Sequence, residues 1–233
     1  MKVAALYDVH GNVRALDAVL AELEGEEVDA IVLGGDVVGG PWPAETLARL
    51  RSLAGDVRWL RGNGERELLG TGGLAPAETT EFVRGGLTGA DAEELAGLPL
   101  SLSLEVDGLG PVLFCHATPR DDAEIRTALS SDERWLEVLD GVAEPVVVCG
   151  HTHVQFDRAV GAKRIVNAGS VGMPYEDEPG AYWALLGLDV QLRRTPYDVE
   201  ATLCEIAGSG FPGEWPQASR DEATTYFESL VGG

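Results

Sequence analysis

The chain has 233 residues, 45% of them hydrophobic, and a formal net charge of −22 at pH 7. This length accommodates one α/β domain with a substantial core, and no apolar run approaches the roughly 18 residues that a membrane span needs. The strong negative charge disfavours long nucleic acid as a partner, because a polyanion would be repelled.

Cysteine usage and the start of the chain indicate the compartment. The three cysteines are an odd number without CxxC spacing, which indicates neither a disulfide framework nor a zinc knuckle. The first eight residues place an acidic residue after a very brief apolar run, unlike a signal peptide. We expect a cytoplasmic protein with no membrane association. The composition does not indicate an oligomeric state.

The first third of the chain alternates between short apolar runs and amphipathic segments. Apolar residues from Val13 to Leu23 recur at helical spacing, and Asn12 can cap that helix. We predict strands at 2–9, 30–33 and 57–60, and helices at 13–23 and 44–53. The βαβαβ order predicts right-handed crossovers and a mostly parallel sheet.

The stretch 67–98 is rich in Gly, Ala, Thr and Glu, and we predict that it is a helical insertion with helices near 76–84 and 90–98. Alternating residues then indicate a hairpin over 100–106 and 112–115, because turn residues separate the two runs. A helix at about 132–139 leads to a buried strand that begins at Val146.

Four strands without intervening helices follow His153, at 156–160, 164–167, 181–188 and 190–194. This succession predicts a second, more antiparallel sheet. Two helices are expected within about 198–230, at 198–207 and 219–230. We expect a single domain over residues 1–233.

Polar residues with ligand chemistry follow five of the predicted strands. Because ligand sites in open α/β sheets lie beyond the carboxyl ends of strands, these residues are expected to meet. Each of them alone has an ordinary explanation as a turn, cap or hydrogen-bonded residue, but all four histidines of the chain belong to the set. The set is Asp8, His10, Asp36, Asn63, His116, His151 and His153.

This mixture of carboxylate, amide and imidazole groups suits two divalent ions such as Mn, Fe, Zn, Ni or Co. It lacks the thiolates of a structural zinc site. Two cations would also allow an acidic protein to bind a small phosphate compound, since they offset the charge of the phosphate and of the local carboxylates.

The motifs resemble those of the calcineurin-like metallophosphoesterase superfamily, and the size is similar to its small bacterial and archaeal phosphodiesterase branch. The resemblance extends from Asp8 to Gly172. It is carried by Asp-x-His at 8–10, Gly-Asp at 35–36, Gly-Asn-x-Glu at 62–65, His116 after a strand, and Gly-His-x-His at 150–153. It implies an α/β fold of four layers, an αββα sandwich of two mixed sheets packed face to face with helices outside.

The resemblance also implies roles for the seven residues. One metal would be held by Asp8, His10 and His153, and the other by Asn63, His116 and His151, with Asp36 as the bridge. Asp36, Asn63 and His116 are therefore also the expected catalytic residues. Manganese is the favoured metal, and a hydroxide between the metals would attack phosphorus in line with the leaving oxygen.

The sequence departs from the family pattern at Gly64, where many members have a histidine that assists the leaving group. A glycine cannot donate a side-chain proton, so good leaving groups such as nucleotides or aryl phosphates are expected. Glu65 is a candidate to support a metal ligand. Arg61, Arg66 and Arg120 lie next to the site loops, and Arg120 is the substrate-binding candidate.

The expected function is hydrolysis of small phosphodiesters or nucleotides. A non-catalytic interaction scaffold on the same fold and a protein phosphatase are the alternatives. A dinucleotide-binding oxidoreductase is disfavoured, because the first loop, at residues 8–12, has neither the GxGxxG turn nor the P-loop residues.

Overall fold

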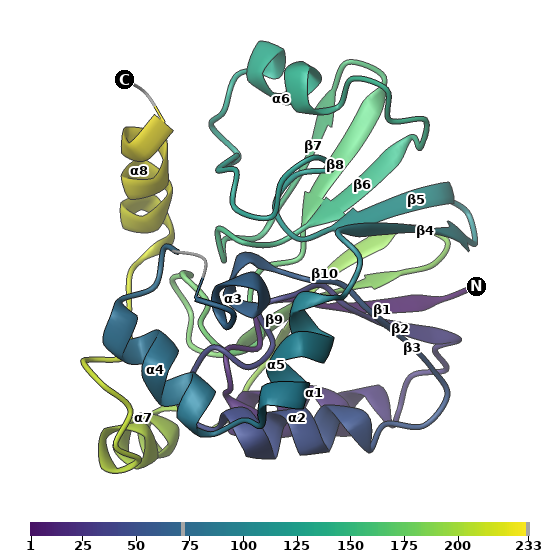
Figure 1. Cartoon of the computed structure of the whole chain (residues 1–233). Helices are drawn as coiled ribbons and strands as arrows, with labels where there is room; N and C mark the ends of the chain where they lie inside the picture. Colours follow the sequence, from purple (N-terminus) through teal and green to yellow (C-terminus); the bar gives the residue numbers. More distant parts are fainter. Residues whose placement is uncertain (71–72, 232–233) are drawn as a thin grey trace.

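The structure is a computed structural model that describes residues 1–70 and 73–231. Two five-stranded sheets face each other, with helices on their outer faces (Figure 1). The first sheet has the spatial order β10 (Val190–Thr195), β9 (Ala181–Leu186), β1 (Val3–Leu6), β2 (Ala30–Leu33) and β3 (Asp56–Trp59). The second has the order β4 (Ser101–Val106), β5 (Gly110–Cys115), β6 (Val146–Cys149), β8 (Lys163–Asn167) and β7 (Phe156–Val160). The predicted αββα sandwich of two mixed sheets is confirmed.

Three apolar layers hold the sandwich together. Helices α1 (Val13–Leu23) and α2 (Pro43–Arg51) pack their apolar faces on the outside of the first sheet, and α6 (Asp132–Val138) packs Trp135 on the outside of the second. Between the sheets, Tyr7 and Phe114 belong to a cluster of fully or nearly buried side chains. Burial of this apolar surface is the main force that keeps the two sheets in contact.

Strands β1, β2 and β3 are parallel, as the βαβαβ pattern predicts. In the second sheet, β5, β6 and β8 are also parallel neighbours. The carboxyl ends of these strands lie on the side of the sandwich where α3 (Asn63–Glu67) begins (Figure 1). The loops with the candidate ligands therefore meet at this edge.

The prediction for the strands after His153 is only partly correct. Strands β7 and β8 join the second sheet, but the β9–β10 hairpin returns to the first sheet, where β9 pairs antiparallel with β1. All six residues of β9 are buried, so this strand needs neighbours on both edges and cover on both faces. Chain order alone did not indicate to which sheet the hairpin belongs.

The helices of the 67–98 stretch are α4 (Ala77–Gly85) and α5 (Gly89–Ala96), while residues 71–72 of that stretch lie outside the described residues. The C-terminal helices are α7 (Val199–Gly208) and α8 (Arg220–Val231), and both lie near the same edge of the sandwich as α4 (Figure 1). No helix in the described residues is both long and apolar enough to cross a membrane.

Candidate metal centre

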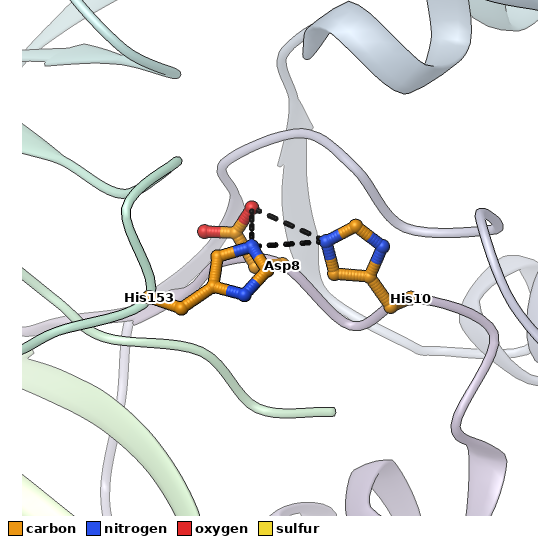
Figure 2. Close-up of side chains that lie close together, drawn as sticks. All are labelled: Asp8, His10 and His153. Carbon is orange, nitrogen blue, oxygen red and sulfur yellow. Dashed lines mark hydrogen bonds and ion pairs between the residues drawn. The ribbon is translucent and has the colours of Figure 1, made fainter. Parts of the chain in front are cut away.

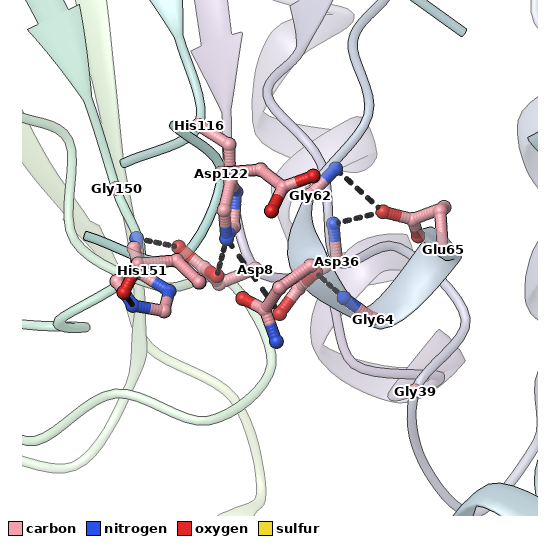
Figure 3. A network of polar contacts seen from close by, with 12 residues as sticks. Asp8, Asp36, Gly39, Gly62, Gly64, Glu65, His116, Asp122, Gly150 and His151 are labelled. Atoms are coloured by element: carbon pink, nitrogen blue, oxygen red, sulfur yellow. Dashed lines mark hydrogen bonds and ion pairs between the residues drawn. The ribbon is translucent and has the colours of Figure 1, made fainter. Parts of the chain in front are cut away.

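The seven candidate ligands come together at the carboxyl edge of the two sheets. Asp8 and His10 follow β1, Asp36 follows β2, and Asn63 is the first residue of α3. From the other sheet, His116 follows β5, and His151 and His153 follow β6. Figure 3 shows most of this arrangement, with Asp8 and Asp36 between the loops of the two sheets.

The backbone at the site has an uncommon conformation. In the described part of the chain, the only non-glycine residues with positive φ are five of the candidate ligands: Asp8, His10, Asp36, His151 and His153. Left-handed conformations cost about 1–2 kcal/mol for residues with a side chain, so the surrounding structure has to hold them in place. Such strain is typical of functional sites.

Glycines of two motifs allow the loops to approach each other closely. A Cβ atom at Gly35, which has φ of 95°, would lie 2.5 Å from the Gly62 nitrogen and 2.8 Å from His116 Nδ1. At Gly150, a Cβ would lie 2.5 Å from Asp8 Oδ2. The Gly-Asp and Gly-His-x-His motifs therefore need glycine because other loops occupy the space.

The first group of ligand atoms consists of Asp8, His10 and His153 (Figure 2). The Nε2 atoms of the two histidines are 3.0 Å apart, and Asp8 Oδ1 lies 3.3 Å from His153 Nε2 and 3.7 Å from His10 Nε2. The Nδ1 atoms point away and contact the carbonyl oxygens of Gly39 and Met173. These backbone contacts fix the rings so that both Nε2 atoms are offered to one ion.

The second group consists of Asp36, His116 and again Asp8. His116 Nε2 lies 3.6 Å from Asp36 Oδ2 and 3.9 Å from Asp8 Oδ1, while its Nδ1 donates to the Gly34 carbonyl. Asp36 Oδ2 is also 3.8 Å from His10 Nε2. Both carboxylates are thus near histidines of both groups. The bridging role of Asp36 stays a prediction, and Asp8 is placed to bridge as well.

Three buried ligand atoms have no hydrogen-bond partner: Asp8 Oδ1, Asn63 Oδ1 and His116 Nε2. A buried polar atom left without a partner costs roughly 1–3 kcal/mol. Asp8 Oδ1 and His116 Nε2 lie 3.9 Å apart, and Asn63 begins α3 at the same sheet edge, so bound divalent cations would supply the missing partners. The residues present therefore fit a metal site.

His151 is oriented differently from the other histidines. Its Nε2 contacts the Ala123 carbonyl at 3.2 Å, so Nδ1 is the nitrogen available to a metal. Its ring lies beside that of His116, with centroids 5.2 Å apart, whereas His153 lies beside His10 at 4.8 Å. The two histidines of the Gly-His-x-His motif thus lie beside different neighbours.

Comparison with known proteins identifies the family. Residues 1–190 match the model of the calcineurin-like phosphoesterase superfamily domain. The chain belongs to this superfamily. The solved structures of a hypothetical protein from Pyrococcus horikoshii and a metallophosphoesterase from Sphaerobacter thermophilus have the same fold. They superpose with TM-scores of 0.77 and 0.70 at 22% and 24% identity, and cover 97% of this chain and 97% and 98% of their own.

Two curated relatives match over different lengths. An uncharacterized protein from Methanocaldococcus jannaschii is 25% identical over 91% of this chain and 94% of its own length. A symmetrical bis(5'-nucleosyl)-tetraphosphatase from Klebsiella pneumoniae is 32% identical over 57% of this chain and 52% of its own length. The chain therefore spans about half the length of that relative.

The charges of the candidate metal centre influence one another strongly. Burial opposes ionisation of Asp8, yet nearby His153 and His116 hold its pKa well below the usual range. Burial also lowers the pKa of His10, but Asp8 and Asp36 outweigh it and raise that pKa to about 9. Burial together with His116 lowers the pKa of His151 to about 4. The carboxylates therefore favour positive charge at the centre, as a cation site requires.

Two glutamates hold the ligands of the first sheet in place. Glu65 accepts hydrogen bonds from the backbone N–H groups of Asp36, Val37 and Gly62, so it joins two ligand loops. Glu67 accepts from Asn63 Nδ2 and leaves Asn63 Oδ1 free. The Gly-Asn-x-Glu motif had indicated Glu65 as a residue that supports a metal ligand. Glu67 was not predicted, because its contact with Asn63 four residues earlier depends on the short helix α3.

The three arginines considered as phosphate ligands have carboxylate partners. Arg61 and Arg66 both bind the buried carboxylate of Asp122, at 3.2 and 2.9 Å, a contact that was not predicted from the sequence. The exposed Arg120 binds Glu124 and Glu137 at 2.7 and 2.9 Å. Its predicted role in substrate binding stays a prediction, and it would require these ion pairs to open.

Proposed function

We propose that this protein is a dinuclear metal-dependent hydrolase of phosphoester bonds in small phosphodiesters or nucleotides. The observation that carries the proposal is that buried polar atoms of Asp8, Asn63 and His116 have no hydrogen-bond partner at the sheet edge where the four histidines lie. Family membership supports hydrolase chemistry. The name of the bis(5'-nucleosyl)-tetraphosphatase relatives favours nucleotides within the substrate class.

The proposed ligand sets are those that the family resemblance implies, and the first of them coincides with the first group of side chains. Asp8, His10 and His153 would hold one ion, and Asn63, His116 and His151 would hold the other, with Asp36 between them. Oxygen and nitrogen ligands without thiolate suit Mn, Fe, Zn, Ni or Co, and manganese is our first choice. Two such ions would lower the pKa of water and neutralise phosphate charge.

The residues of the chain position the reactants and limit the substrates. The Gly64 N–H donates to Asp36 Oδ1 at 2.7 Å and so orients this carboxylate, but Gly64 provides no side-chain proton for the leaving group. All four histidines are ligand candidates, so none is left over for that role. We therefore expect hydrolysis of nucleotides or aryl esters to be faster than hydrolysis of simple alkyl monoesters.

The test is a screen of the metal-reconstituted protein against phosphodiesters, dinucleoside polyphosphates and monoesters. The variant His151→Ala should lose most of the activity and bind fewer than two ions per chain by mass spectrometry of the native protein. Glu27→Gln changes an exposed side chain far from the site and serves as the matched control. Two bound ions without hydrolysis of any compound would instead favour the scaffold function.

A further inference from the structure

The C-terminal part of the chain encloses a cavity that the proposed chemistry does not use. Residues 191–233 lie outside the family match, which ends at residue 190. Together with the loop at 172–180, the described part of this segment surrounds a cavity of about 460 Å³. This volume is within the range of small-molecule sites. We call it the C-terminal cavity.

The C-terminal cavity adjoins the first group of metal ligands. Met173 lines it, and the Met173 carbonyl accepts the hydrogen bond from His153 Nδ1. Asn12 also lines it, two residues after His10, and donates to the Gly172 carbonyl. A ligand in this cavity would therefore be a direct neighbour of the loops that hold His10 and His153.

Trp215 forms the aromatic wall of the cavity and lies close to the His10 loop. A Cβ atom at Gly40 would be 1.8 Å from the His10 carbonyl oxygen and 3.1 Å from Trp215 Cη2. Phe211 packs edge-on against the Trp215 ring and holds it in place. The indole is only partly buried, and its N–H has no hydrogen-bond partner among the described residues. Trp215 thus lines the cavity with an aromatic ring and one unused donor.

The side chains that line the C-terminal cavity are unsuited to binding a phosphate group. Apolar and aromatic side chains such as Leu203, Ile206 and Tyr197 line one part of the cavity, and four carboxylates line another. No lysine, arginine or histidine is among the described residues that line it. Two of the four carboxylates pair with arginines that are not among the lining residues. A flat, uncharged group with N–H donors fits such walls, because it can stack on the indole and donate to the carboxylate oxygens that stay free.

We propose that the C-terminal cavity binds the nucleobase of a nucleotide substrate, with Trp215 as the stacking surface. The inference rests on the proposed function, since it requires that a phosphate be held at the adjacent metal centre. The family fold would then supply the chemistry, and the segment after residue 190 would supply the selectivity for nucleosides over other phosphoesters. A base is recognised mainly by its flat face, so stacking would tolerate several bases.

The first experiment measures the cavity without the metal centre. Adenosine is titrated into metal-free protein and followed by NMR, which detects millimolar binding. Trp215→Ala removes the stacking surface, and Ala218→Trp fills the cavity. Each variant should bind adenosine roughly tenfold more weakly or worse than wild type. Trp215→Phe should retain most of the binding. Leu188→Trp adds the same bulk at a residue that is 88% exposed, outside the cavity, and is the matched control.

The second experiment compares AMP with ribose 5-phosphate, which lacks the base, on metal-loaded protein. Wild type should bind AMP more tightly, and the preference should fall toward one in Trp215→Ala and Ala218→Trp. Circular dichroism verifies that each variant is folded. If adenosine binds equally to wild type and both variants, or to none, the inference is overturned even where hydrolysis is found. If adenosine binds as expected but no compound is hydrolysed, the cavity assignment stands and the proposed function fails.

Discussion

The orientation of each candidate ligand is set by a contact on its far side. The Nδ1 atoms of His10, His116 and His153 contact backbone carbonyls, so their Nε2 atoms converge. His151 is held through Nε2 instead. The sequence predicted which residues meet at the sheet edge. It could not predict which ring nitrogen each histidine offers, because the partner carbonyls belong to distant or irregular segments.

Glu65 provides a test of positioning that does not alter a ligand. Glu65→Gln replaces one carboxylate oxygen by an amide NH₂, which cannot accept the backbone N–H groups that Glu65 now binds. The loops of Asp36 and Gly62 should separate, and metal affinity should fall by roughly 10–100-fold. Calorimetric titration with Mn²⁺ measures the change, with the exposed Glu27→Gln as control. Unchanged affinity in both variants would show that Glu65 does not position the centre.

A similar test applies to the amide ligand. Glu67→Ala removes the acceptor of Asn63 Nδ2, so the amide is free to rotate and its Oδ1 is no longer directed to the centre. We expect one ion to bind more weakly and the other to bind as in wild type. The calorimetric titration with Mn²⁺ would resolve these as two separate affinities. Equal loss of both ions would instead indicate that α3 itself is disrupted, which circular dichroism would reveal.

Most helices and strands could be predicted from sequence periodicity. The assignment of strands to the two sheets could be predicted only in part. The helix at Val13–Leu23 has the predicted bounds, because its apolar spacing and its Asn12 cap agree. Helix α3 was not predicted, since its five residues are too few for a periodic signal. The return of β9 to the first sheet also escaped prediction. That choice depends on long-range pairing with β1, which local sequence does not encode.

The N-terminal cap of α5 allows a pH test at the level of an element. Asp91 accepts from the Thr88 side chain and, less strongly, from Arg51, and these contacts lower its pKa to about 2. A carboxyl whose folded pKa is depressed stabilises the protein above its unfolded pKa, and this contribution is lost as pH falls toward the folded value. Asp91→Asn should therefore lower Tm at pH 7, and the difference from wild type should shrink below about pH 4.

The control for this prediction is Glu93→Gln on the same helix, an exposed side chain. Its Tm should follow wild type throughout. Thermal unfolding monitored by circular dichroism between pH 3 and pH 7 gives both comparisons. A difference between Asp91→Asn and wild type that stays constant over this range would contradict the assigned ion pairing and capping.

The whole molecule carries 39 acidic and 17 basic residues, and many of the basic ones are engaged in ion pairs at its surface. Its field therefore attracts cations and repels phosphate compounds at a distance. Divalent ions at the sheet edge would reverse the sign locally. On the proposed function, the approach of a phosphate substrate would then depend on attraction by the metal ions acting against repulsion by the rest of the protein.

This balance predicts an uncommon salt dependence. As ionic strength rises from about 0.01 to 0.15 M, the Debye length falls from about 30 to 8 Å, and the distant surface charges are screened more than the close metal contacts. With metal saturating, KM for a dinucleoside polyphosphate should therefore fall as sodium chloride is added, while binding of uncharged adenosine should stay constant. Steady-state kinetics and the adenosine titration at matched salt measure the two effects. A KM that rises with salt would contradict the prediction, because it would mean that attraction by the metal ions and nearby arginines outweighs the repulsion by the distant carboxylates.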